Sequence, residues 1–195
     1  MTTHARPFLV LASLALAACG DSGGADMGRD PDQGGGDCSV TAAPVAASGQ
    51  DLVIEALDLI DDRIRLRNVS SEPIDAPDYW YCREIGVYQM FNAGVIPAGG
   101  TVTLDLPASL RVDNNSQLSI YETGRFTSVD DIRAFVRWGV SEEMAGDDRQ
   151  NIAVGAGIWT DGEFVLTEAD TRGFVATGDV TVGSGWTATD DPACF

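Results

Sequence analysis

Apolar and polar residues alternate strictly in several short segments of this chain, and each segment is bounded by Gly, Pro, Asn or Asp. The clearest segments are residues 63–67 (RIRLR), 101–106 (TVTLDL) and 117–121 (QLSIY). A period of two places successive side chains on opposite faces of a strand, so these segments are predicted to be half-buried β-strands. Further strands are predicted at residues 79–88, 132–138, 151–159 and 163–166, with a hairpin turn at residues 160–163 (TDGE).

Helical patterns are scarce by comparison. Only residues 128–134 suggest a short helical turn, which Ser128 is placed to cap. Many short strands separated by turn residues predict an all-β antiparallel sandwich. Residues 38–195 have the length of a single domain with room for a hydrophobic core, so we expect one sandwich over this range.

The N-terminus resembles the export signal of a bacterial lipoprotein. Residues 1–6 are basic, and residues 7–18 are apolar but shorter than the roughly 20 residues that span a bilayer. Residues 16–20 (LAACG) are similar to a lipobox. This resemblance implies a signal peptide over residues 1–18 and a mature chain that begins at Cys19, acylated with chains such as palmitate. An ordinary secretory signal with a chance cysteine is the alternative.

Several acyl chains on one residue hold a protein firmly at a membrane, whereas a single chain is marginal. No later segment has an apolar run long enough to span a bilayer, so the lipid on Cys19 is the expected membrane contact. Gly20, rather than Asp, follows this cysteine. By resemblance to the enteric sorting rule, this implies the outer membrane.

Residues 19–37 are rich in Gly, Asp, Ser and Pro and contain almost no apolar side chain. Such a segment cannot bury enough surface to offset its backbone entropy, so we expect a flexible tether. Its acidic spacing lacks the twelve-residue calcium loop that ends in Glu.

The charge balance excludes several classes of function. The chain has 30 acidic and 12 basic residues, all of the latter arginine, and a formal net charge of −18. Nucleic-acid binding by a basic surface is therefore not expected. The one histidine, His4, lies in the predicted signal peptide. Without mature histidine or lysine, His-dependent triads, Schiff bases and imidazole metal sites are excluded, which leaves chemistry based on carboxylates and oxygen ligands.

Several short motifs follow one another along the chain, at residues 62–68, 74–75, 79–82, 96–102, 135–139 and 156–165, and at Trp186. Taken in this order, they resemble a bacterial lamin tail domain. The resemblance covers the chain from about Leu52 to Trp186 and implies an immunoglobulin-like β-sandwich that is an accessory module without catalysis. Arg65 stands where the family usually has an acidic residue, at a position expected on the surface.

Three sets of side chains are candidate sites, each with a simpler alternative. Arg63, Arg65 and Arg67 project from one strand face and form either an anion-binding site or ion pairs with neighbouring carboxylates. Four tryptophans are either carbohydrate platforms or, as alternation favours, core: Trp80, Trp138, Trp159 and Trp186. The acidic pairs at residues 142–143, 147–148 and 190–191 are either calcium ligands or solvated loops. No metal or cofactor is assigned.

Three cysteines remain after acylation of Cys19, and an oxidising compartment favours pairing of two. We predict a disulfide between Cys38 and Cys194, at the two ends of the domain. Cys82 is predicted to stay reduced, on the same strand face as Trp80 and inside the sandwich. A bridge from Cys82, or no bridge, is the alternative.

The leading hypothesis for function is an envelope lipoprotein whose sandwich binds another envelope protein or a polysaccharide without turning it over. A carboxylate-dependent glycan hydrolase is the second hypothesis, and it requires two inward-facing acids in a cleft, one with a raised pKa. A calcium-stabilised structural domain is the third.

Overall fold

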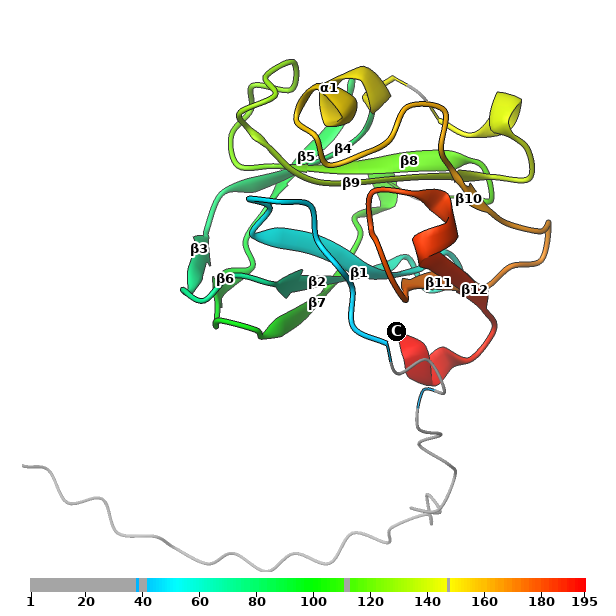
Figure 1. The fold of residues 1–195 in the computed structure, drawn as a ribbon, viewed down its shortest axis with the longest axis horizontal. Helices are drawn as coiled ribbons and strands as arrows, with labels where there is room; N and C mark the ends of the chain where they lie inside the picture. The colour runs from blue at the N-terminus through cyan, green and yellow to red at the C-terminus, as the bar shows by residue number, and fades with distance from the viewer. Residues whose placement is uncertain (1–37, 39–41, 111–112, 147) are drawn as a thin grey trace, which may run out of the picture. The chain divides into compact units, whose positions relative to one another are not determined.

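Two five-stranded β-sheets face each other in the computed structural model, which describes residues 38, 42–110, 113–146 and 148–195 (Figure 1). The first sheet has the strand order β12-β11-β1-β2-β7, and the second has the order β10-β9-β8-β4-β5. The strands are β1 (Leu52–Asp58), β2 (Arg63–Asn68), β3 (Ile74–Ala76), β4 (Tyr79–Glu84), β5 (Val87–Phe91), β6 (Gly94–Ile96), β7 (Thr101–Asp105), β8 (Ser116–Tyr121), β9 (Ile132–Gly139), β10 (Val165–Leu166), β11 (Gly173–Ala176) and β12 (Trp186–Thr189).

All strand pairs within the first sheet are antiparallel. In the second sheet only the short β10 runs parallel to its neighbour, β9. Strands β3 and β6 form a separate antiparallel pair. The predicted all-β, immunoglobulin-like antiparallel sandwich is therefore confirmed.

The alternating segments form strands because one of their faces meets the opposite sheet. In β2, Ile64 and Leu66 are fully buried, and the arginines that alternate with them, Arg63, Arg65 and Arg67, are only partly buried. Across the core, the ring of Trp138 on β9 lies 5.3 Å from that of Phe174 on β11. Burying such large apolar side chains between the sheets is the main contribution to the stability of a sandwich.

Strand β1 was not predicted, although it lies in the middle of the first sheet. All seven of its residues (LVIEALD) are buried, so it shows no alternation. The register with β2 shifts between Ile54 and Ala56, which places a β-bulge at Glu55. A bulge of this kind turns the side chain of its extra residue, and here the carboxylate of Glu55 reaches arginines on β2.

The strand predicted over residues 79–88 is in fact a hairpin of β4 and β5. Glu84 pairs with Val87, and Gly86 adopts a φ of +87° in the turn between them. A positive φ favours glycine because it has no Cβ. The prediction was wrong because the apolar pattern continues through the two-residue turn.

The strand predicted over residues 151–159 is also wrong, because this segment begins with the helix α1 (Gln150–Gly155). Its fully buried Ala153 packs toward the outer face of the second sheet, which α1 covers (Figure 1). The amides of Gly157 and Ile158 donate to the carbonyls of Val154 and Ala153, and Gly157 has a φ of +73°. This is a Schellman C-cap, so local hydrogen bonding and packing outweigh the β-branched composition.

Two smaller predictions also change. Residues 160–163 form a turn, closed by the amide of Glu163 donating to the carbonyl of Thr160, but the turn leads from the α1 region into β10 and joins no hairpin. Ser128 accepts from the amide of Asp130 in a single turn, and β9 begins directly afterwards, at Ile132. A helix does not develop there because strand pairing in the sheet supplies the backbone hydrogen bonds.

Short 3-10 helices complete the described fold: η1 (Ala108–Leu110), η2 (Glu142–Met144), η3 (Gly183–Gly185) and η4 (Pro192–Cys194). Among the described residues, no helix has the length and apolarity needed to cross a membrane. The predicted signal peptide over residues 1–18, the acylation site Cys19 and the tether over residues 19–37 lie outside the described residues.

Candidate functional site

The arginines of β2 lie together on the outer face of the first sheet, where two of them share one carboxylate. Arg65 Nε donates to Glu55 Oε2 at 2.8 Å, and Arg67 Nε donates to Glu55 Oε1 at 2.7 Å. Arg67 also donates to the carbonyl of Gly99. Glu55 is buried, and the two guanidinium groups balance the negative charge of its carboxylate.

The third arginine, Arg63, belongs to a second ion-pair cluster. Arg63 and Arg172 each donate to the fully buried Oδ2 of Asp58 at 2.9 Å, and both also contact Asp61. Burial alone would raise the pKa of Asp58. The pKa is nevertheless below its usual value, because Asp58 accepts hydrogen bonds from the Asp61 amide, Arg63 and the Ile60 amide. The positive charge of Arg172 lowers it further.

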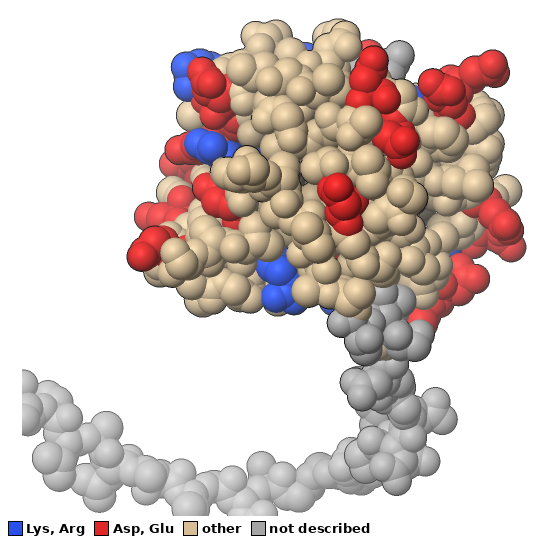
Figure 2. Space-filling model, viewed as in Figure 1, with Lys and Arg blue, Asp and Glu red and all other residues tan. Residues whose placement is uncertain are grey.

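These contacts bear on the two interpretations of Arg63, Arg65 and Arg67. Each guanidinium group already contacts a carboxylate on or next to β1. A site for an exogenous anion needs cationic donors that are still available. The arrangement therefore matches the ion-pair alternative. On the face shown in Figure 2, acidic side chains are widely scattered and basic ones are few.

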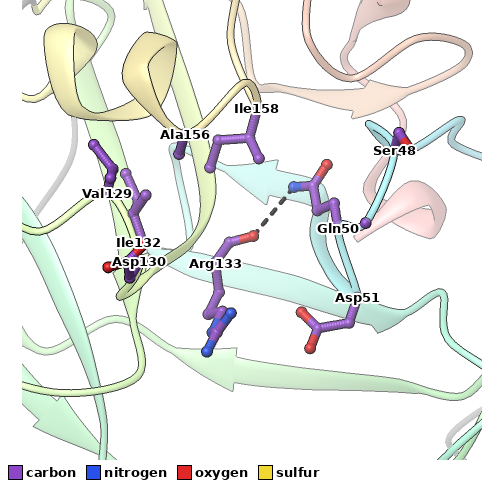
Figure 3. A pocket seen from close by; sticks show the side chains of 10 residues that line it. Ser48, Gln50, Asp51, Val129, Asp130, Ile132, Arg133, Ala156 and Ile158 are labelled. Atoms are coloured by element: carbon purple, nitrogen blue, oxygen red, sulfur yellow. Dashed lines mark hydrogen bonds between the residues drawn. The ribbon is translucent and has the colours of Figure 1, made fainter.

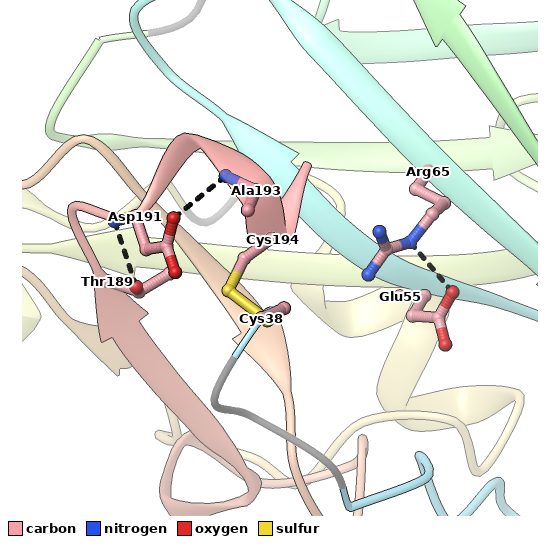
Figure 4. Close-up of a disulfide and its surroundings, with 7 residues drawn as sticks. All are labelled: Cys38, Glu55, Arg65, Thr189, Asp191, Ala193 and Cys194. Carbon is pink, nitrogen blue, oxygen red and sulfur yellow. Dashed lines mark hydrogen bonds and ion pairs between the residues drawn. A yellow bond between two sulfur atoms is a disulfide. The ribbon is translucent and has the colours of Figure 1, made fainter. Parts of the chain in front are cut away.

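The predicted cysteine pair is present at bonding distance. The sulfurs of Cys38 and Cys194 lie 2.05 Å apart, with 4.8 Å between their Cα atoms (Figure 4). Cys194 is fully buried against Ala56 of β1 and Val175 of β11, in a small second core outside the sandwich. The bridge thus holds the two ends of the domain over the outer face of the first sheet.

Cys82 is a buried free thiol, as predicted, but it faces the outside of the second sheet. Its neighbour Tyr81 occupies the inner face, where it stacks on Phe91 and lies near Asp105 of the opposite sheet. On the outer face Cys82 is covered by Arg149, whose Nε donates to its sulfur at 3.3 Å. Burial raises the pKa of Cys82, and Arg149 offsets only part of that increase.

Three of the four tryptophans are buried: Trp138, Trp159 and Trp186. Each directs its indole N–H to a backbone carbonyl, those of Asp113, Glu163 and Val180 respectively. A buried tryptophan with a satisfied N–H is a core residue, as alternation favoured. Trp80 differs, because it is only partly buried and lies on the outer face of the second sheet.

The acidic pairs do not converge. Within the described part of the chain, no three Asp, Glu, His or Cys side chains are grouped closely enough to hold a metal ion. Asp148 accepts from the amide of Ile85, Asp190 from that of Arg172, and Asp191 from that of Ala193. Asp147 lies outside the described residues.

A hollow of about 240 Å³ lies between residues 48–51, the start of β9 and the end of the α1 region (Figure 3). Gln50 Nε2 donates there to the carbonyl of Arg133, and Gln50 Oε1 accepts from the amide of Ala47. The guanidinium group of Arg133 pairs with Glu122, while its Nε is buried without a hydrogen-bond partner. The side chain of Gln50 is therefore held by the protein itself.

The most distinctive exposed feature lies on the β4–β5 hairpin. Tyr88 and Met90 of β5 are 47% and 50% exposed, although both are large apolar side chains. Tyr88 stacks on Phe126 with 4.4 Å between ring centroids, and Trp80 packs edge-on against both rings. Trp80, Tyr88, Met90 and Phe126 are called the hairpin surface below.

Strand β5 is also the edge of its sheet, and none of its five residues is charged. Edge strands are usually protected by charge, proline or a bulge, because their free backbone groups can pair with another chain. This surface was not predicted from the sequence, because the pattern over residues 79–88 indicated a single strand. Gly86 was the signal for the turn, but Phe126 comes from a distant loop and could not have been placed.

Comparison with known proteins finds no relative: no family model matches the chain, and no curated protein matches it. A function for the domain therefore has to be inferred from its own structure.

Proposed function

We propose that this chain is a lipid-anchored envelope protein whose lamin-tail-like sandwich binds another envelope protein without catalysis. The observation that carries the proposal is the hairpin surface on an uncharged edge strand. Tyr88 and Met90 are each about half exposed there, in a chain with a formal net charge of −18. Exposed apolar surface of this kind marks a site of interaction.

A protein partner suits this surface better than a polysaccharide. Tyrosine, tryptophan, phenylalanine and methionine are the side chains enriched in protein interfaces. β5 is an edge strand, and an edge strand can pair with an extended segment of a partner, as in β-strand addition. Phe126 occupies one face of Tyr88, so only the other face of this ring could stack on a sugar.

The anchored location is supported by the resemblance of residues 16–20 to a lipobox and by the composition of residues 19–37. A tether of that length and polarity would hold the domain away from an anionic lipid surface, which repels its acidic residues. A non-catalytic role is supported by the ionisable groups. Among the described residues, the pKa values of two carboxyl groups are shifted, those of Asp58 and Asp131, and both are lowered, whereas a general acid needs a raised pKa.

Capture from a detergent extract of the native envelope tests the proposal. Wild-type protein and a Tyr88→Ser/Met90→Ser variant are immobilised at equal density, and captured proteins are identified by mass spectrometry. The wild type is expected to retain a defined protein that the variant loses. Treating the extract with protease beforehand should abolish the capture.

Leu166→Ser is the matched control. Leu166 is 66% exposed on β10, at the opposite edge of the same sheet, so it tests for nonspecific apolar adhesion. Equal capture by the wild type and the Tyr88→Ser/Met90→Ser variant would contradict the proposal. Capture that survives protease but is lost when glycans are removed would assign the surface to a polysaccharide instead.

A further inference from the structure

The loop that joins β8 to β9, residues 122–131, carries Phe126 to the hairpin surface. The ring of Phe126 stacks on Tyr88 with 4.4 Å between centroids and meets Trp80 edge-on at 5.6 Å. None of residues 122–130 is fully buried. Burial of apolar side chains therefore contributes little to holding this loop in one conformation, and other contacts must do so.

The two ends of the loop meet at one buried side chain, that of Asp131, which is only 4% exposed. Arg125 Nε donates to Asp131 Oδ2 at 2.8 Å, and Arg125 Nη2 donates to Oδ1, so the guanidinium group binds both carboxylate oxygens. Thr123 Oγ1 donates to the same carboxylate, and the amide of Glu122 donates to the carbonyl of Asp131. These contacts tie the start of the loop to its end.

The position of Arg125 in the chain links this ion pair to the hairpin surface. Phe126 follows Arg125 directly, and the amide of Ser128 donates to the carbonyl of Arg125 at 3.0 Å, which turns the chain just after the ring. Gly124 precedes Arg125 and lies over Trp80, because a Cβ at this glycine would be 3.8 Å from the indole ring. An Arg–carboxylate pair with two hydrogen bonds fixes direction as well as distance. The pair therefore holds this part of the loop against the hairpin.

The ion pair is formed at neutral pH. Burial raises the pKa of Asp131, but hydrogen bonds from Thr123 and Arg125, with the positive charges of Arg125 and Arg133, leave it below its usual value. The side chain of Arg125 is itself 70% exposed, so its guanidinium group adds little to the packing of the core. Arg125 can therefore be changed with little effect on the sandwich.

We propose that Arg125 and Asp131 form a latch that assembles the hairpin surface. With the latch closed, Phe126 is held on Tyr88 and the surface can bind its partner. With the latch open, the loop releases Phe126 and binding is lost. The effect on binding rests on the function proposed above, whereas the effect on the ring stack needs no partner. Arg125 and Asp131 are positioning residues in this account, because they act through Phe126.

Nuclear magnetic resonance of the full chain with labelled aromatic rings tests the latch itself. The signals followed are the nuclear Overhauser cross-peaks between the rings of Tyr88 and Phe126. Arg125→Gln is expected to abolish these cross-peaks, with a melting temperature within about 4 °C of wild type. The matched control is Glu122→Gln, which removes the ion pair with Arg133 in the same loop but leaves the latch intact. That variant is expected to keep the cross-peaks.

Capture from a detergent extract of the native envelope measures the effect of the latch on binding. Arg125→Gln is expected to retain at least about fivefold less of the protein that the wild type captures, as loss of charge-assisted hydrogen bonds requires. Glu122→Gln should stay within about twofold of wild type. Arg125→Lys keeps a charge that can reach Asp131 at one point but lacks the planar fork, so its capture should lie between those of Arg125→Gln and the wild type.

Four results would overturn the proposal. One is persistence of the Tyr88–Phe126 cross-peaks in Arg125→Gln, which would show that the loop is held without the latch. Another is loss of these cross-peaks with unchanged capture. The third is equal loss in Glu122→Gln, which would reduce the effect to the charge of the loop, and the fourth is capture by Arg125→Lys no better than by Arg125→Gln. Absence of any captured protein with the wild type is a different result, because it contradicts the proposed function while the cross-peaks still decide whether the latch exists.

Discussion

The Nε of Arg149 lies 3.3 Å from the sulfur of Cys82, so the residue that precedes α1 is bonded to strand β4 across 67 positions of sequence. Both residues are buried, and their contact is part of the packing on the outer face of the second sheet, beside α1. A thiol in this position serves as a small packed acceptor rather than as a nucleophile.

The thiol of Cys82 is expected to be unreactive in the folded protein. Burial raises its pKa, so the thiolate is scarcer at neutral pH than in an exposed cysteine. With Cys19 acylated or replaced by serine, a colorimetric disulfide reagent should label Cys82 only after denaturant is added. Rapid, stoichiometric labelling of the native protein would show that the thiol is accessible.

The disulfide between Cys38 and Cys194 closes a loop across 156 positions. In the chain-entropy model, removing such a bridge lowers the free energy of unfolding by up to about 5 kcal/mol. A Cys38→Ser/Cys194→Ser variant should therefore unfold at lower urea concentration, and reductant should destabilise the wild type but not this variant. Non-reducing peptide mapping is the direct check, and a linked peptide that contains Cys82 would overturn the pairing.

Asp58→Asn is expected to lower the free energy of unfolding by about 3 kcal/mol at neutral pH, because Arg63 and Arg172 lose a buried anionic partner. Asp61→Asn is the control. Asp61 contacts the same arginines but is half exposed, so the expected loss is below about 1 kcal/mol.

The pH dependence of the Asp58→Asn effect has a definite sign. The pKa of Asp58 is lowered in the folded protein, so its contribution is complete above the unfolded pKa and disappears as pH falls through the folded pKa. The difference in stability between wild type and Asp58→Asn should therefore shrink below about pH 4. A difference that stays constant down to the acid-unfolded state would show that the carboxylate charge is not the cause.

The alternation in β2 and β7 predicted strands because each has only one face toward the core. It failed for β1, whose outer face is also covered, by the ion pairs of Glu55 and by the segments that the disulfide holds. The run over residues 151–159 was too short to separate a strand from a helix. Its helix depends on the Gly157 cap and on packing of Ala153, which only the folded structure supplies.

Some features of the candidate site could be predicted from the sequence, and others could not. The pairing of Cys38 with Cys194 followed from their positions at the two ends of the domain. The outward direction of Arg63, Arg65 and Arg67 followed from alternation, but their ion pairs depend on the bulge at Glu55 and on Asp58. The hairpin surface required Phe126 to reach β5 from the loop after β8, and no periodic pattern reports such a contact.

The register of the core is tested by Leu66→Asp. Leu66 is fully buried on the inner face of β2, so an unpaired carboxylate there is expected to prevent folding. Thr103→Asp is the control, since Thr103 is exposed on β7 directly opposite Arg65. Circular dichroism and thermal melting should show a folded Thr103→Asp protein and no cooperative transition for Leu66→Asp. A normal melt for Leu66→Asp would mean that the register is wrong.

Site-specific photo-crosslinking in the intact envelope tests the hairpin surface most directly. Tyr88 is replaced by p-benzoylphenylalanine in one strain and Leu166, on the opposite edge of the same sheet, in another. The account predicts that irradiation joins the chain to one defined protein from the Tyr88 position and that this adduct is absent from the Leu166 position. The same adduct from both positions, or none from Tyr88, would contradict it.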